Sequence, residues 1–140
     1  GVAQTEKLLS AIASGVYDFI VINYPNPDMV AHTGNLPASI KACQLVDGWL
    51  RQIYDRVMKT DGWSLLVTAD HGNVEELINL ETGGVDTEHS GFPVPLILTG
   101  SAWQNRRTSL KRGILGDVAP TILKILGLAQ PSSMTGHSLI

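Results

Sequence analysis

The chain has 140 residues and a formal net charge of −3, and its 44% apolar and 16% charged residues exclude a disordered protein and predict one globular domain. The mildly acidic balance disfavours nucleic acid as a partner, and no apolar run approaches the roughly 20 residues of a membrane span. The single cysteine, Cys43, excludes a disulfide scaffold, so we expect a cytoplasmic protein with neither a signal peptide nor a membrane partner.

The first sixty residues predict a helix, a strand and a second helix. Apolar residues at helical spacing predict an amphipathic helix that ends at Gly15. A short apolar run over residues 18–23 predicts a buried strand. Asn35 is expected to cap a long helix with Pro37 in its first turn. Its apolar face is predicted to comprise Ile40, Cys43, Val46, Leu50, Ile53 and Val57, with Cys43 a core residue rather than a nucleophile.

The second half predicts two more strands and a final helix. The strands cover residues 64–68 and 95–99, separated by a short helical stretch over 74–78 and an irregular loop over 79–92. Asp117 is expected to cap the last helix, and Gly127 to end it. Alternating helices and strands predict the α/β class with a mainly parallel, helix-covered sheet. A sheet usually has about five or six strands, so three predicted strands indicate that the chain is part of a larger domain.

Three of the four histidines lie near acidic residues, in segments that follow or connect the predicted strands. In open α/β sheets, ligands bind at the carboxyl ends of the strands, so we expect the three clusters to converge there. His137 has no acidic neighbour and is predicted to be a tail residue. The clusters are Asp28 with His32, Asp70 with His71, and His89 with Asp86 and Glu88.

Each cluster has a metal-binding interpretation and a plainer one. One helical turn would place Asp28 and His32 on the same side, where their oxygen and nitrogen atoms could bind Mn²⁺ or Zn²⁺. Taken alone, however, Asp28 is better explained as the cap of a turn and His32 as a surface residue. Asp70 could likewise cap a helix. His89 alone would be an exposed loop histidine.

The second cluster has the stronger metal-binding signal. A strand stops at Asp70 and His71, and Gly72 then lets the chain turn. Asn73 and Glu76 resemble a capping box, which leaves Asp70 and His71 free to bind metal.

Taken together, these segments resemble a known family. The stretches NYPNPDMVAHTGN (23–35), TADHGN (68–73) and HSGFPVP (89–95) are similar to the cofactor-independent (2,3-bisphosphoglycerate-independent) phosphoglycerate mutases of the alkaline phosphatase superfamily. The segments GDVAPTI (116–122) and MTGHSLI (134–140) are similar as well. The chain departs from the family pattern at Ala31, Gly91, Phe92 and His137, and none of these positions removes a ligand.

The resemblance implies an alkaline phosphatase-like, three-layer α/β/α fold and an enzyme with two divalent metal ions, usually Mn²⁺. Such an enzyme interconverts 3-phosphoglycerate and 2-phosphoglycerate in glycolysis through a phosphoserine. By the match, Asp28, His32 and His89 correspond to one metal's complete set of protein ligands. Asp70 and His71 correspond to half of the second set.

The resemblance also implies that parts of the machinery lie outside this sequence. The family's nucleophilic serine, a further aspartate and an arginine-rich substrate domain have no match here, so residues 1–140 are expected to be the C-terminal portion of a metal-binding phosphatase domain, inactive alone. The intact parent is expected to be monomeric. The alternatives are another superfamily member, such as a phosphopentomutase or a phosphatase, or a metal-binding domain without catalysis.

Overall fold

The computed structural model describes residues 1–79, 81–106 and 109–140, and these form helices around a two-stranded sheet. Short 3₁₀ turns lie at Val74–Glu76 (η1), Ser101–Trp103 (η2) and Leu115–Asp117 (η3). The α-helices are α1 (Val2–Ser14), α2 (Asn26–Ala31), α3 (Leu36–Met58) and α4 (Val118–Ile125), and the strands are β1 (Leu65–Thr68) and β2 (Leu96–Thr99).

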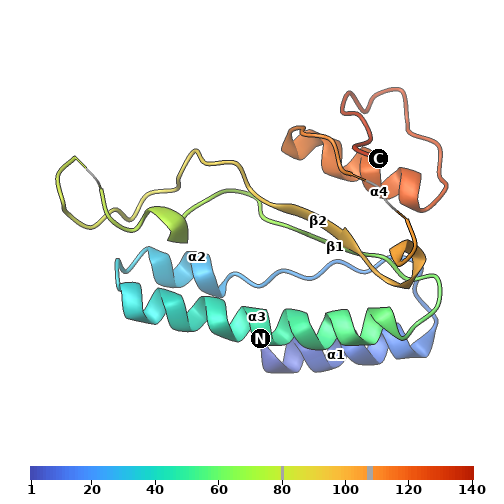
Figure 1. The fold of residues 1–140 in the computed structure, drawn as a ribbon, viewed down its shortest axis with the longest axis horizontal. Helices are drawn as coiled ribbons and strands as arrows, with labels where there is room; N and C mark the ends of the chain where they lie inside the picture. The colour runs from blue at the N-terminus through green and yellow to red at the C-terminus, as the bar shows by residue number, and fades with distance from the viewer. Residues whose placement is uncertain (80, 107–108) are drawn as a thin grey trace.

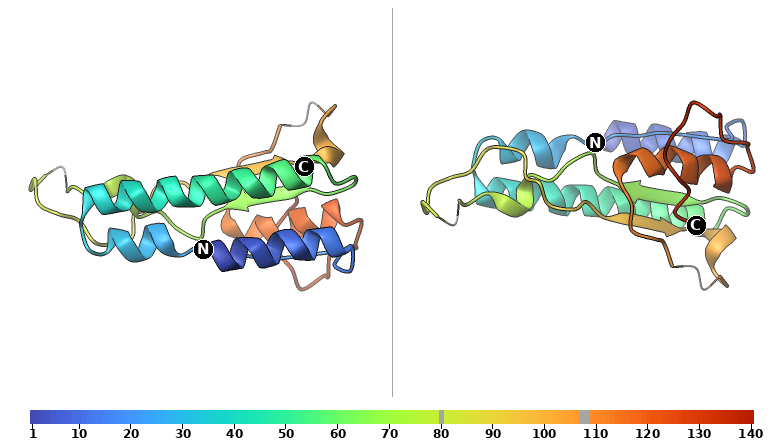
Figure 2. Two further views of the ribbon diagram at one scale, coloured as in Figure 1. Left: turned by 90° about the horizontal axis from the view of Figure 1, so that it is seen from below. Right: turned by 90° about the horizontal axis from the view of Figure 1, so that it is seen from above.

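Helices α1 and α3 form the core. They run side by side in the same direction (Figure 2), and Leu8 and Ile12 of α1 cluster with Ile53 and Val57 of α3. Gly15 ends α1 at φ 64°, which confirms the predicted end, because this left-handed conformation costs glycine little.

The N-terminal half of α3 differs from the prediction. Asn35 does cap the helix, since its side chain accepts a hydrogen bond from the backbone N–H of Ala38 at 3.0 Å. However, Cys43 is exposed, and the buried residues in this half are the small Ser39 and Ala42. Helix α2 packs against α3, and small side chains permit this close approach, so the buried face is rotated from the predicted one.

The sheet of the described residues shows none of the expected parallel pairing. Strands β1 and β2 are antiparallel, with Leu65 opposite Thr99 and Thr68 opposite Leu96. Within its described residues, the connection over 69–95 holds only the turn η1 and no crossover helix, and it returns like a long hairpin, which explains the antiparallel pairing.

The predicted buried strand over residues 18–23 is also corrected, because among the described residues this segment pairs with neither β1 nor β2. Ile20 and Ile22 pack on the core, whereas Phe19 and Val21 point the other way and are 50% and 76% exposed. The segment is thus extended, with one face buried and the other open.

Helices lie on both sides of the strands. Figure 1 shows α1, α2 and α3 below the strands and α4 above them, with residues 18–23 running in the same direction as β1. A groove of about 1150 Å³ is lined by residues of this segment, β1 and α4, including Ile22, Val67 and Ile122. In the described part of the chain, no helix is long and apolar enough to cross a membrane.

The start of α4 is tied to the C-terminal segment. Asp117 precedes the helix as predicted, but its side chain does not cap it. Instead, its carboxylate accepts hydrogen bonds from the backbone N–H groups of Ile114 (2.9 Å) and His137 (2.7 Å). These bonds lower the pKa of Asp117 below its ordinary value. Gly127 follows the end of α4 at φ 69°, as predicted.

Candidate metal centre

Helix α2 positions two of the predicted ligands. The sequence Pro25-Asn26-Pro27 starts the helix, which places Asp28 in its first turn and His32 at its C-terminal end, on the same side. The Nε2 atom of His32 lies 3.4 Å from Oδ1 of Asp28. The structure therefore has the one-turn spacing on which the sequence argument depended.

The third predicted ligand, His89, comes from the loop between η1 and β2. The Nε2 atom of His89 lies 3.3 Å from Oδ1 of Asp28 and 3.3 Å from Nε2 of His32. One ligand atom from each of these three residues lies within 4.8 Å of the others. Residues 57 positions apart in the sequence thus converge on one point.

The environment of His32 fixes which nitrogen faces that point. Its Nδ1 lies 2.7 Å from the backbone carbonyl oxygen of Thr87, which can only accept a hydrogen bond, so Nδ1 carries the proton. In the neutral ring Nε2 is then unprotonated and offers its lone pair beside the Asp28 carboxylate. This combination of imidazole nitrogen and carboxylate oxygen fits a borderline divalent cation.

The charge of Asp28 is stabilised by its surroundings. A hydrogen bond from Nδ2 of Asn73 to Oδ1 of Asp28, 2.7 Å long, lowers the pKa of this carboxyl below its ordinary value. Partial burial opposes this effect, and His32, His71 and His89 support it. Asp28 is therefore an anion at neutral pH, as a metal ligand must be.

Asp70 and His71 lie beside this group but do not complete a second one. The ring of His71 stacks on that of His89, with centroids 3.7 Å apart. Its Nε2 lies 3.6 Å from Oδ2 of Asp70, whose side chain is 87% exposed. Within the described residues, the one group of three or more possible ligand atoms is that of Asp28, His32 and His89.

Two residues that hydrogen-bond to the predicted ligands, Asn73 and Thr87, were not predicted from the sequence. The predicted capping box is wrong: the Asn73 side chain makes no capping bond, and its backbone N–H donates to Glu75 rather than Glu76. The cue that could have identified Asn73 is its place two residues after His71, in the polar segment that follows β1. No sequence cue could have identified the backbone carbonyl of Thr87, because every residue has a backbone carbonyl.

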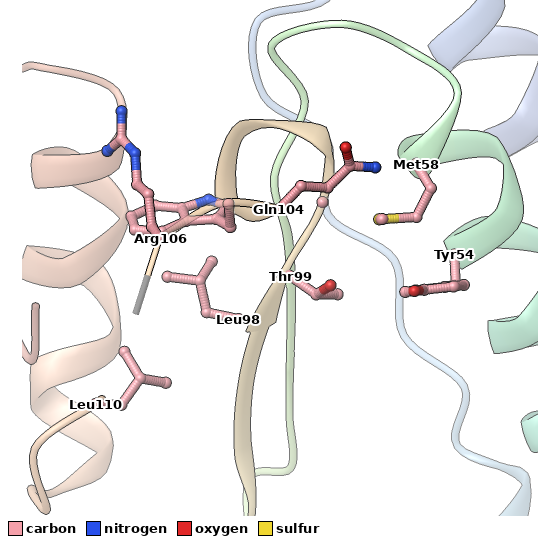
Figure 3. Close-up of a pocket in the computed structure, with 9 residues that line it drawn as sticks. Tyr54, Met58, Leu98, Thr99, Gln104, Arg106 and Leu110 are labelled. Atoms are coloured by element: carbon pink, nitrogen blue, oxygen red, sulfur yellow. The ribbon is translucent and has the colours of Figure 1, made fainter. Parts of the chain in front are cut away.

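A separate cavity of about 310 Å³ lies between the end of α3 and the end of β2 (Figure 3). Tyr54, Met58, Leu98 and Trp103 are among its lining residues, and none of the predicted ligands is. This cavity is therefore distinct from the candidate metal centre.

Comparisons with known proteins agree with this chemistry. The metalloenzyme superfamily matches residues 2–130. The 2,3-bisphosphoglycerate-independent phosphoglycerate mutase of Chloroflexus aggregans is 50% identical over 97% of this chain and 25% of its own length. The enzyme of that name from Rhodopseudomonas palustris is 51% identical over 96% of this chain and 26% of its own length.

A solved structure is similar as well. It is a phosphoglycerate mutase of Leishmania mexicana crystallised at low cobalt concentration, with a TM-score of 0.85 and 32% identity over 99% of this chain and 27% of that one. The chain thus spans about a quarter of the length of its curated relatives. Because the family match extends over most of the sequence, the chain belongs to the metalloenzyme superfamily, whose members' chemistry implies binding of divalent metal.

Proposed function

We propose that this chain is part of a 2,3-bisphosphoglycerate-independent phosphoglycerate mutase, a glycolytic isomerase that interconverts 3-phosphoglycerate and 2-phosphoglycerate. The observation that carries the proposal is the convergence of Asp28, His32 and His89 on one point. Relatives of that name at about 50% identity, and a phosphoglycerate mutase with the same fold, support it.

The five predicted ligands have unequal roles in this proposal. Asp28, His32 and His89 would hold one divalent cation, with open positions for water or phosphate. Asp70 and His71 would supply half the protein ligands of a second cation. Mn²⁺ is the proposed ion at both sites, and other divalent ions fit the same donors. Bound cations of this kind neutralise phosphoryl charge and lower the pKa of a serine hydroxyl.

The contribution of this chain to the reaction is positioning and charge. Asp28 supplies an anion, and His32 presents Nε2 because Thr87 holds the proton on Nδ1. The phosphoryl group would move from O3 of glycerate to a serine and then to O2. In each transfer the hydroxyl that receives phosphorus loses its proton and the oxygen that loses phosphorus gains one, so no co-reactant is consumed. The serine and the glycerate-binding arginines are proposed to lie outside these 140 residues.

The proposal extends to the whole domain. Residues 1–140 would be the C-terminal portion of an alkaline phosphatase-like domain with a three-layer, mainly parallel sheet. The parallel course of residues 18–23 and β1 in Figure 1 and the exposed face of Phe19 and Val21 support such a sheet. The parent is proposed to be a cytoplasmic monomer that binds phosphoglycerate, with neither nucleic acid nor membrane as a partner.

The proposal is tested by titrating Mn²⁺ into the 140-residue chain by calorimetry. We expect one tight site, lost in His32→Ala and in His89→Ala and weakened less in His71→Ala. The matched control is His137→Ala, because His137 is an exposed histidine outside the cluster. An assay of 2-phosphoglycerate formation by the chain alone should show no turnover. Two equally tight sites, measurable turnover, or equal effects of His137→Ala and His32→Ala would contradict the proposal.

A further inference from the structure

Asn73 is a buried polar residue, 5% exposed, and its side-chain hydrogen bond is to a proposed metal ligand. A carboxylate accepts but cannot donate, so the amide must present Nδ2 to Asp28, as it does at 2.7 Å. The other amide atom, Oδ1, is buried without a hydrogen-bond partner among the described residues. Leaving a polar atom buried and unpaired is costly, which indicates that the contact with Asp28 determines this orientation.

Glu75 connects Asn73 to the loop that carries His89. Its Oε2 accepts a hydrogen bond from the backbone N–H of Asn73 at 2.9 Å, and its Oε1 accepts one from the hydroxyl of Ser90. Ser90 in turn donates its backbone N–H to the carbonyl of Gly72 at 2.9 Å. One carboxylate therefore joins the chain after β1 to the residue next to His89.

Gly72 is required for this connection. A Cβ atom at this position would overlap both the carboxylate of Glu75 and the hydroxyl of Ser90. A side chain at residue 72 would therefore displace the contact between Glu75 and Ser90.

We propose that Asn73 and Glu75 are positioning residues of the metal centre: Asn73 fixes the carboxylate of Asp28, and Glu75 holds the His89 loop against the chain after β1. This inference rests on the proposed metal site. Asp28 and His89 lie on segments 61 positions apart, and a metal site works only when its ligands are held within about 0.5 Å of their bound geometry. The two residues supply that alignment without themselves binding metal.

The test uses Co²⁺ as the probe, because its visible absorption reports the geometry of its ligands. Asn73→Leu keeps a similar size and removes the donor, and Glu75→Gln replaces one acceptor oxygen without changing shape. We expect Asn73→Leu to weaken Co²⁺ binding by about 10–100-fold and to change the absorption band. Glu75→Gln should likewise weaken Co²⁺ binding and change the absorption band. Because the Glu75 side chain is exposed, this variant should fold even if Asn73→Leu does not.

Two controls separate positioning from general stability. Glu76→Gln makes the same chemical change one residue along, at a carboxylate with no shared contact to Asn73 or Ser90 among the described residues. Asn35→Leu removes the cap of α3 and lowers stability without touching the ligands. Both should retain the wild-type affinity and spectrum.

The outcomes distinguish the two proposals. If the wild-type chain binds no Co²⁺, the proposed metal site itself fails. If the wild type binds but Asn73→Leu and Glu75→Gln match it in affinity and spectrum, the site stands and the positioning role is overturned. Affinity losses that match melting-temperature losses across all four variants would also overturn it, because they would reflect stability alone.

Discussion

Gly34 lies where the turn after α2 contacts the loop that leads to His89, close to the candidate metal centre. It lies between α2 and α3 at φ 65°, and a Cβ atom there would overlap the side chain of Val85 in the loop that leads to His89. This approach of the loop to the α2–α3 turn therefore depends on the absence of a side chain at residue 34.

The prediction at this scale compares Gly34→Ala with Gly83→Ala. Gly83 also has positive φ, 68°, but open space around its Cβ position. Both substitutions should cost the roughly 1–2 kcal/mol of a left-handed residue, and Gly34→Ala should cost more because it also displaces Val85. Urea unfolding of both variants measures the difference. Equal losses would show that the contact with Val85 is unimportant.

The residues of the site could be predicted only in part. Histidines and acids near strand ends are visible in a sequence, and the structure brings Asp28, His32 and His89 together as expected. Their role as ligands stays a prediction. The bond from Asn73 to Asp28 and the carbonyl of Thr87 could not be predicted, since both depend on how distant segments fold together.

At the scale of elements, helix ends were predictable and strand pairing was not. Asn35 and Gly15 carry local signals, so the ends of α3 and α1 follow from the sequence. The direction of β2 relative to β1 depends on the path of residues 69–95, which has no local signal. The burial of Ser39 and Ala42 instead of Cys43 likewise depends on where α2 packs.

The extended segment 18–23 leads to a second prediction. Ile22 packs on the core and Val21 is 76% exposed, so Ile22→Ala should lose about 1–3 kcal/mol, whereas Val21→Ala should lose less than about 0.5 kcal/mol. Chemical denaturation of the two neighbouring variants tests this. A larger loss for Val21→Ala would mean that the opposite face of the segment is the buried one.

The link between α4 and the C-terminal segment predicts a pH dependence. The hydrogen bonds from His137 and Ile114 lower the pKa of Asp117 in the folded chain below its ordinary 3.8. This stabilisation is present above about that pH and is lost as the pH falls through the lower, folded pKa. Asp117→Asn should therefore have a lower melting temperature than the wild type at pH 7, and this difference in melting temperature should disappear in acid.

Melting curves from pH 7 down to pH 2 measure this gap. Asp61→Asn is the control, because Asp61 is exposed in the turn after α3. A gap for Asp117→Asn that is the same at every pH would show that the charge of Asp117 does not stabilise the fold.

At the scale of the whole molecule, the groove between residues 18–23, β1 and α4 predicts the behaviour of the isolated chain. It is lined by apolar residues such as Ile22, Val67 and Ile122. Exposed apolar surface of this extent binds hydrophobic dyes and promotes association. We expect the chain to enhance the fluorescence of anilinonaphthalene sulfonate before it unfolds, and to melt without high thermal stability. A high melting temperature with no dye binding would contradict this.

The distance in sequence between His32 and His89 has a consequence for unfolding. A cation held by both would act as a removable cross-link that closes a long loop of the chain, much as a disulfide does. Mass action then adds about 2.7 kcal/mol of stability at a free-ion concentration 100 times the Kd. A chelator should remove that increment, and proteases should then cut within residues 81–92 well before they cut α1 or α3.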